Sequence, residues 1–154
     1  MSIIKARKYL KKYNYDDKIL EFPVSSATVS EAALALNCEE GEIAKTLSFL
    51  IDDKPILIVV GGDYKIDNSK YKSEFNVKAK MIPFNDVESL IGHAAGGVCP
   101  FGINEGISVY LDISLKEHEY IYPACGSSNS AIKLSINELE ELSNYQKWID
   151  VCKK

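Results

Sequence analysis

The sequence predicts a single α+β domain over residues 1–154. Short runs rich in β-branched and aromatic residues alternate with segments whose apolar residues recur at helical spacing. Several of the helical segments begin with a capping pattern, in which Ser, Thr or Asn precedes Glu by three positions. The 154 residues are enough for one hydrophobic core, and the chain contains no internal repeat, low-complexity tract or linker. These observations favour short strands and helices interspersed within one domain.

The N-terminal part is expected to form two helices with a short strand between them. Apolar residues at spacings of three and four predict an amphipathic helix over residues 2–13. A short strand follows over 19–23. The capping box Thr28-x-x-Glu31 then opens a helix that Asn37 ends.

A β-hairpin is expected in the middle of the chain. A second short helix is predicted over residues 39–44, and two β-rich runs, 47–51 and 56–60, flank the turn residues 52–55. Lys45 would then lie where a helix becomes a strand. Side chains at such junctions are commonly presented at the rim of a sheet.

The next elements alternate between helix and strand. A helix is expected over 68–75 and a short strand over 78–82. The capping pattern Asn85-x-x-Glu88 predicts another helix, which runs to Gly92.

The C-terminal part is expected to complete the sheet. Strands are predicted over residues 107–113, 119–122 and 131–134. The pattern Ser135-x-x-Glu138 then opens a last helix.

Composition indicates a globular, cytoplasmic protein whose net charge does not attract nucleic acid. No apolar run approaches the roughly 20 residues that cross a bilayer, and the basic first residues lack the apolar core of a signal peptide. The net charge is −4 and Arg7 is the only arginine, so any contact with RNA must be local and made through lysines or backbone amides. Lys8, Lys11 and Lys12 on the first helix are either simply solvated or contact a tRNA backbone.

The four cysteines are expected to be reduced. They include no C-x-x-C pair, and without a secretory signal an even count is not a disulfide framework. A zinc site from Cys99, Cys125, His93 and His118 would lack the short paired spacing of structural zinc, so no metal or other cofactor is expected.

The segment Gly92–Gly102 has the composition of a ligand-binding loop. It holds four of the nine glycines together with Pro100. Glycine lets the backbone approach a bound group, and proline fixes φ, which leaves neighbouring amides available to a ligand. The alternative is an ordinary tight turn. Within the loop, Cys99 could be a nucleophile or a small buried residue, and His93 could be a general base or form a structural hydrogen bond.

Two further motifs accompany this loop. Residues 43–47 read Ile-Ala-Lys-Thr-Leu, residues 96–102 read Gly-Gly-x-x-Pro-x-Gly, and residues 126–134 read Gly-Ser-x-Asn-x-x-Ile-x-Leu. In this order they resemble the YbaK/EbsC/ProX family of free-standing editing domains, which are related to the insertion domain of bacterial prolyl-tRNA synthetases. The likeness extends from about residue 18 to 142. It implies a mixed, partly barrel-like β-sheet surrounded by helices.

The resemblance implies a trans-editing hydrolase without a cofactor. Such a protein deacylates mischarged aminoacyl-tRNA, here a small noncognate amino acid on a tRNA that is expected to be tRNA for proline, with prolyl-tRNA synthetase as a further partner. An aminoacyl ester is already activated toward water, so the protein needs mainly to position it, stabilise the oxyanion and admit water. A catalytically idle module that binds an amino acid or a tRNA end for regulation would show the same motifs. A metal- or thiol-dependent protein using Cys99 and His93 is the other alternative.

The resemblance also assigns residues. Lys45 matches the lysine that the family requires for deacylation and would anchor the tRNA 3′ end, whereas its own setting also fits a surface lysine. Gly97 in the loop that lines the aminoacyl pocket would be the other catalytic position. The remaining positions are expected to contact substrate: Thr46, Gly96, Val98, Cys99, Pro100, Gly126, Ser127, Ser128 and Asn129.

Three details qualify this assignment. The polar residues 126–129 would also suit a turn held by its own side chains. Asp63 matches a frequent family aspartate, and the alternative is that it merely caps the turn after the hairpin. Ala131 stands where the cysteine-specific branch of the family usually has an acidic residue, so the substrate amino acid does not follow by analogy.

Overall fold

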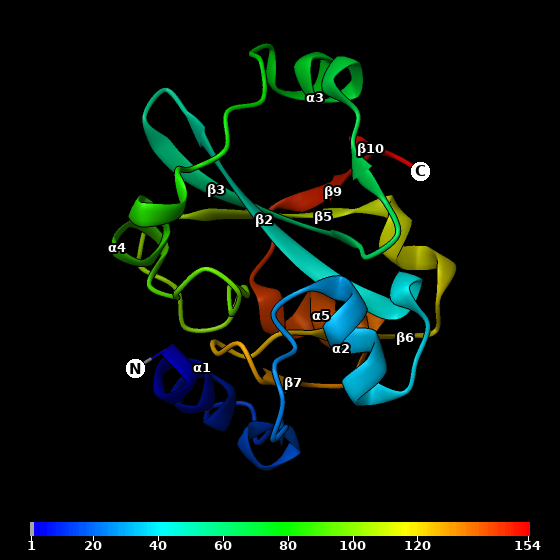
Figure 1. Ribbon diagram of the computed structural model, residues 1–154. Coiled ribbons are helices and arrows are strands. Elements are labelled where there is room, and N and C mark those ends of the chain that lie inside the picture. The colour runs from blue at the N-terminus through cyan, green and yellow to red at the C-terminus, as the bar shows by residue number, and fades with distance from the viewer. Residues whose placement is uncertain (1) are drawn as a thin grey trace.

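A computed structural model describes residues 2–154 as one α+β fold around a curled sheet (Figure 1). Helices pack on both faces of the sheet, and the first helix and the last strand lie on different sides of the molecule (Figure 1). The elements, with η for 3₁₀ helices, are α1 (Ser2–Lys11), η1 (Asp16–Lys18), β1 (Leu20–Glu21), α2 (Val29–Leu36), η2 (Glu40–Glu42), β2 (Ile43–Ile51), β3 (Lys54–Gly61), β4 (Lys65–Ile66), α3 (Asn68–Phe75), η3 (Phe84–Asp86), α4 (Val87–Ile91), β5 (Ser108–Asp112), η4 (Ile113–Glu117), β6 (Tyr120–Pro123), β7 (Ser130–Ala131), β8 (Leu134–Ser135), α5 (Ile136–Ser143), β9 (Lys147–Ile149) and β10 (Cys152–Lys153).

The main sheet has six strands in the order β8-β6-β2-β3-β5-β9. The pairs β2–β3 and β6–β8 are antiparallel, whereas β2–β6, β3–β5 and β5–β9 are parallel. Two small antiparallel sheets, β1–β7 and β10–β4, join segments that are far apart in sequence. The mixed, partly barrel-like sheet expected from the resemblance is therefore confirmed.

The predicted hairpin is present as β2–β3, and it is longer than predicted. It lies at the centre of the main sheet. Its turn residues Asp52 and Asp53 both have positive φ, 50° and 62°. Two such residues make the type I′ turn whose twist suits a two-residue hairpin, and Asp tolerates this conformation better than most residues.

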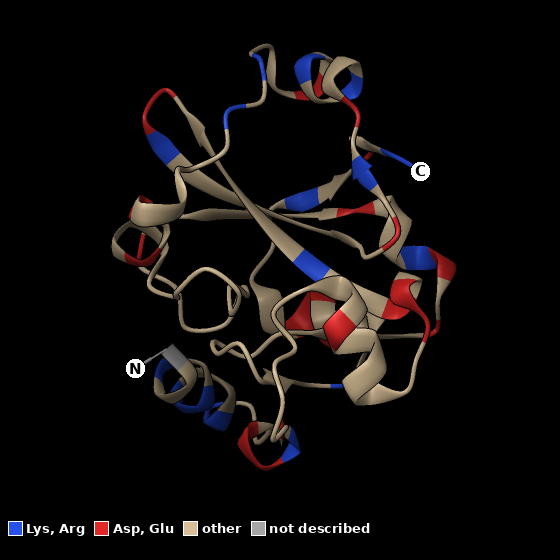
Figure 2. Cartoon of the chain, in the orientation of Figure 1, with Lys and Arg blue, Asp and Glu red and all other residues tan. Residues whose placement is uncertain are grey.

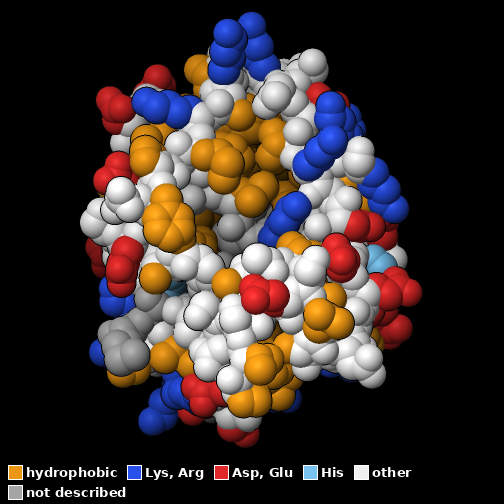
Figure 3. All heavy atoms as spheres, viewed as in Figure 1, with side chains coloured by type: hydrophobic (Ala, Val, Ile, Leu, Met, Phe, Trp, Pro, Cys, Tyr) orange, Lys and Arg blue, Asp and Glu red, His pale blue; other side chains and the backbone are white. Residues whose placement is uncertain are grey.

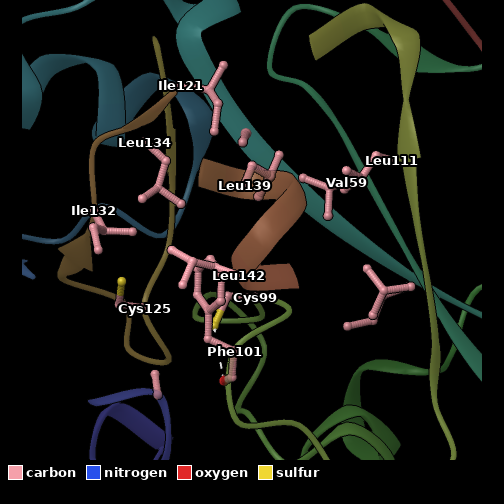
Figure 4. Close-up of a cluster of buried hydrophobic side chains, with 14 of the residues drawn as sticks. Val59, Cys99, Phe101, Leu111, Ile121, Cys125, Ile132, Leu134, Leu139 and Leu142 are labelled. Atoms are coloured by element: carbon pink, nitrogen blue, oxygen red, sulfur yellow. Dashed lines mark hydrogen bonds between the residues drawn. The ribbon is translucent and has the colours of Figure 1, made fainter. Parts of the chain in front are cut away.

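Apolar side chains are buried on both faces of β3. Leu57 and Val59 belong to the larger cluster, and Ile58 and Val60 to a second cluster on the other face. Figure 4 shows Val59 and Leu111 of the sheet with Leu139 and Leu142 of α5 in the larger cluster. Burial on both faces explains why β3 reads as an unbroken apolar run rather than as an alternating one.

Two of the predicted capping boxes are present. Thr28 caps α2 and Ser135 caps α5, each with the glutamate three residues later bonded back to the cap. Both helices end at an asparagine in the left-handed conformation, Asn37 and Asn144. Local signals at each end therefore set the limits of these helices.

We expect Ser135→Ala to lower the free energy of unfolding by about 1 kcal/mol, the usual cost of losing an N-cap side chain. Ser135 Oγ accepts from the Glu138 amide at 3.1 Å, and Glu138 Oε1 accepts from the Ser135 amide at 2.9 Å. Urea denaturation would measure the loss. The control is Ser73→Ala on the exposed side of α3, which should change stability by less than about 0.5 kcal/mol. Equal stabilities of the two variants would contradict the capping role.

The short helix expected over residues 39–44 was wrong in its second half. Only η2 is helical, and Ile43 and Ala44 already pair with the end of β6 as part of β2. Lys45 is consequently the third residue of a long strand and does not lie at a junction between helix and strand.

Two other local predictions were wrong. The strand expected over 78–82 is reduced to a single bridge between Met81 and Phe49. The capping pattern at Asn85 is not used, because the chain enters α4 through η3 and Asp86 at the cap position makes no side-chain bond.

Pairing between distant segments accounts for the remaining differences. The run 131–134 is divided between β7 and β8, which pair with different strands. The strands β4, β9 and β10 were not predicted, since each is only two or three residues long and depends on a distant partner. No helix within residues 2–154 is long and apolar enough to cross a membrane.

Candidate functional site

A cavity of about 500 Å³ lies beside the first half of β2. Its walls are formed by some of the residues in each of five segments: 26–32, 43–48, 81–87, 95–98 and 122–131. Figure 3 shows the hollow in this face of the molecule, with hydrophobic side chains on its floor and a basic side chain at its wall. Its volume is in the range of small-molecule sites.

The cavity forms where β2 has no strand beside it on one edge. Ala44 is the last residue of β2 that pairs with β6, and farther along the Leu50 amide donates to Lys80 O at 2.9 Å while Ser48 O accepts from Ile82 N at 3.1 Å. Successive residues of a strand direct their backbone groups to alternate edges. The N–H and C=O of Thr46 therefore face the same edge as those of Ser48 and Leu50. Thr46 itself lines the cavity, so a ligand there has a backbone donor and acceptor within reach.

Lys45 is the one charged residue of β2, seen as the blue segment of that strand in Figure 2. It also lines the cavity, and its Nζ donates to Gly62 O at 3.5 Å and to Tyr64 O. Partial burial lowers the pKa of Lys45, and this is opposed by the Cys152 thiol and the Asp63 carboxylate. An ammonium group has three N–H donors, so two backbone carbonyls leave one for a ligand oxygen.

The turn that holds Lys45 is itself fixed by neighbouring elements. The Gly61 amide donates to Ser114 Oγ at 2.9 Å, and Tyr64 OH donates to Glu117 at 2.9 Å. Asp63 is exposed and forms an ion pair of 3.6 Å with Lys154. The position of the Lys45 ammonium therefore depends on residues that are distant in sequence.

The glycine-rich loop forms the opposite wall through Gly96 and Val98. Within residues 2–154, the backbone amides of these two residues donate to no protein acceptor. The Gly97 amide, in contrast, donates to Ala94 O at 3.0 Å, and Gly97 O accepts from Gly126 N at 3.0 Å. The free donors of the loop are thus on either side of Gly97, which joins this loop to the motif at 126–134.

Cys99 and His93 are fully buried behind the loop. Burial raises the pKa of the Cys99 thiol to about 12, so it stays protonated near neutral pH. Cys99 Sγ lies 3.6 Å from His93 Nε2, and that nitrogen is 2.6 Å from Phe101 O. Burial also lowers the pKa of His93. This arrangement fits the structural alternative for both residues better than a nucleophile and a base.

The polar residues after Gly126 bond mainly to one another and to the segment before α2. Ser127 Oγ lies 2.7 Å from Ser130 Oγ. Asn129 Nδ2 donates to Phe22 O at 2.9 Å, and Ser128 O accepts from the Ser26 amide at 2.6 Å. Ser130 and its neighbour Ala131 line the cavity in their place.

The predicted site residues therefore fall into two groups. Lys45, Thr46, Gly96 and Val98 line the cavity. In the described part of the chain, the others do not line it, and their contact with substrate stays a prediction: Gly97, Cys99, Pro100, Gly126, Ser127, Ser128 and Asn129.

Sequence reasoning missed two walls of the cavity. One is the entry to α2 at Ser26–Val29, and the other is the segment from Met81 to Val87. The capping box at Thr28 marks the start of a helix but does not indicate what the helix faces. No three His, Cys, Asp or Glu side chains of residues 2–154 come together in a metal-binding arrangement.

Comparison with known proteins gives consistent matches over this fold. Residues 24–142 match the family described as the aminoacyl-tRNA editing domain. The chain is 47% identical over 154 residues to the uncharacterized protein YwhH of Bacillus subtilis, covering 99% of this chain and 98% of YwhH. It is 28% identical over 85 residues to proline-tRNA ligase of Bacillus cytotoxicus, which is 54% of this chain but only 15% of the ligase.

A solved structure matches nearly the whole chain. It is the crystal structure of a candidate trans-editing enzyme for prolyl-tRNA synthetase, with a TM-score of 0.88 and 28% sequence identity. The match covers 99% of this chain and 98% of that one.

Proposed function

Because this chain belongs to the aminoacyl-tRNA editing domain family, we propose that it is a hydrolase that removes a small noncognate amino acid from tRNA, with tRNA for proline as the substrate. The observation that supports this most directly is the position of Lys45, whose ammonium group stands at the wall of a mainly apolar cavity of small-molecule size. The likeness to proline-tRNA ligase and to a candidate trans-editing enzyme supports the choice of tRNA and a link to prolyl-tRNA synthetase.

The residues of the cavity suggest how the ester is handled. Lys45 would anchor a phosphate or ribose oxygen of the tRNA 3′ end with its remaining N–H. The free amides of Gly96 and Val98 would stabilise the oxyanion that forms when water attacks the ester carbonyl. The Thr46 carbonyl would accept a hydrogen bond from the α-ammonium group. In this scheme positioning and charge stabilisation replace a protein nucleophile.

A deacylation panel tests the proposal. Purified protein would be mixed with tRNA for proline charged with alanine, cysteine, serine or threonine, and release of the amino acid would be compared with the spontaneous rate. Acceleration of at least one member is expected. Binding without acceleration of any member would instead support a catalytically idle module that recognises an amino acid or a tRNA end.

We expect prolyl-tRNA to be spared. The cavity walls contain close glycine backbone, and the secondary ammonium group of proline has two N–H donors where a primary ammonium group has three. A site whose fixed acceptors use all three protons of the correct substrate therefore leaves one acceptor unpaired when proline is bound. Leaving a buried acceptor unpaired costs about 1–3 kcal/mol, which corresponds to roughly 5- to 150-fold in rate. The ratio of kcat/KM for alanyl-tRNA and prolyl-tRNA at equal enzyme measures this. Comparable rates for the two substrates would refute it.

A further inference from the structure

Phe84 is an exposed aromatic side chain at the mouth of the cavity. It lines the cavity, yet 77% of the residue is accessible to solvent, and the neighbouring Met81 is 56% exposed. Phenylalanine is usually buried, so an exposed ring at a cavity mouth suggests contact with a ligand. Within residues 2–154 the ring stacks on no other aromatic side chain.

The backbone that carries this ring is anchored. Phe84 begins η3, whose Asp86 amide donates to Pro83 O at 2.8 Å. Ile82 and Val87 on either side of it are 4% and 6% exposed and belong to the larger core cluster. The backbone that carries the ring is therefore held in place by core residues on both sides, although the ring itself is exposed.

The interior of the cavity has a different character from its mouth. Small side chains, Ala44, Ala95 and Ala124, form part of the wall, and Lys45 supplies a positive charge. Among the described residues that line the cavity there is no Asp or Glu. A ligand with a small group inside, an anionic or oxygen-rich part near Lys45 and a flat ring outside would match these features.

We propose that Phe84 stacks on the unpaired terminal base of the tRNA 3′ end and thereby places the aminoacyl ester inside the cavity. The proposal rests on the proposed function, and it adds the residue that binds the nucleotide. Unpaired bases stack readily on aromatic side chains, with little dependence on which base is present. The adjoining ribose would then lie between the ring and Lys45, and the small amino acid would enter among the alanines.

Steady-state deacylation tests this assignment with three variants. Phe84→Ala is expected to raise KM for a charged acceptor-stem RNA about 10-fold or more, the usual effect of losing one stacked base. Phe84→Tyr should have a KM within about two-fold of wild type, because this variant keeps an aromatic ring. Leu34→Ala is the matched control, since Leu34 is 83% exposed on α2 but does not line the cavity. An unchanged KM in Phe84→Ala would overturn the proposal.

A binding measurement separates this proposal from the hydrolase assignment. An uncharged RNA with 2-aminopurine in place of the terminal adenine should lose fluorescence on binding to wild type and to Leu34→Ala, but not to Phe84→Ala. Quenching without hydrolysis of any charged RNA would support the base site and overturn the hydrolase. Hydrolysis by wild type with equal quenching in Phe84→Ala would overturn the base site alone, and absence of RNA binding to wild type would also overturn it.

Discussion

Replacing Lys45 with alanine is expected to reduce kcat/KM for deacylation at least about 100-fold, the scale on which enzymes lose rate when one preorganised charge contact is removed. The ammonium group is held by Gly62 O and Tyr64 O at the cavity wall, so its position is set before substrate arrives. No other basic side chain lines the cavity within residues 2–154, and a neighbouring lysine therefore cannot substitute for it.

Substitution of Lys45 should lower the deacylation rate without unfolding the protein. Lys45 is only partly buried, and its aliphatic chain contributes modestly to packing, so Lys45→Met, which keeps an apolar chain of similar length, should leave the thermal midpoint within a few degrees of wild type. Lys54→Ala, at the exposed start of β3, is the matched control and should retain full activity. Rates and melting curves would be recorded together. Activity of Lys45→Ala within a few-fold of wild type would remove Lys45 from the proposed site.

The elements that could be predicted from sequence carry their own local signals. The helix over residues 68–75 was predicted with the bounds it has in the structure, and Thr28 and Ser135 cap α2 and α5 as expected. The hairpin was predicted because Asp52 and Asp53 mark its turn. Each signal lies within a few residues of the element that it specifies, which is why a single sequence is enough.

The elements that were missed depend on distant partners. Residues 147–149 form a strand because β5 lies beside them, and residues 152–153 because β4 does. The same holds for Ile43 and Ala44, which were expected to be helical but extend β2 against β6. Propensity is a weak guide where pairing in the folded protein decides the conformation.

The candidate site likewise has parts with a local sequence signal and parts that depend on distant segments. The motifs directed attention to Lys45, Thr46 and the glycine loop, which do meet at one cavity. The segment with Met81 and Phe84 could not have been recognised, because it contains no motif and reaches the cavity only by lying along the open edge of β2. The hydrogen bond from the Gly97 amide to Ala94 O within the loop could not be predicted from the sequence either.

Gly97→Ala is the other change for which a large loss of activity is expected. A Cβ atom at this position would lie 2.6 Å from both Gly126 C and Ser127 N. These are backbone atoms, so no side-chain rotation can relieve the contact and the two loops must move apart. Overpacking of this kind costs about 1–3 kcal/mol in stability.

The loss of activity follows from where the displaced loop lies. Gly96 and Val98, on either side of Gly97, line the cavity and carry the free amides proposed to bind the oxyanion. A displacement of about 1 Å in a catalytic group can reduce a rate roughly 100-fold, so a loss of that order is expected even where the variant remains folded. Circular dichroism at the assay temperature would confirm that it is folded.

Cys99→Ala is the matched comparison because it changes a buried residue of the same loop without adding an atom. It removes a thiol whose pKa is raised to about 12 by burial, and it requires no change in the backbone conformation of the loop. We expect its kcat/KM to stay within a few-fold of wild type and its stability to fall by about 1 kcal/mol. The opposite pattern, with Cys99→Ala inactive and Gly97→Ala active, would replace catalysis by backbone amides with catalysis by the thiol. The pair of variants therefore decides whether the loop acts through its backbone or through a side chain.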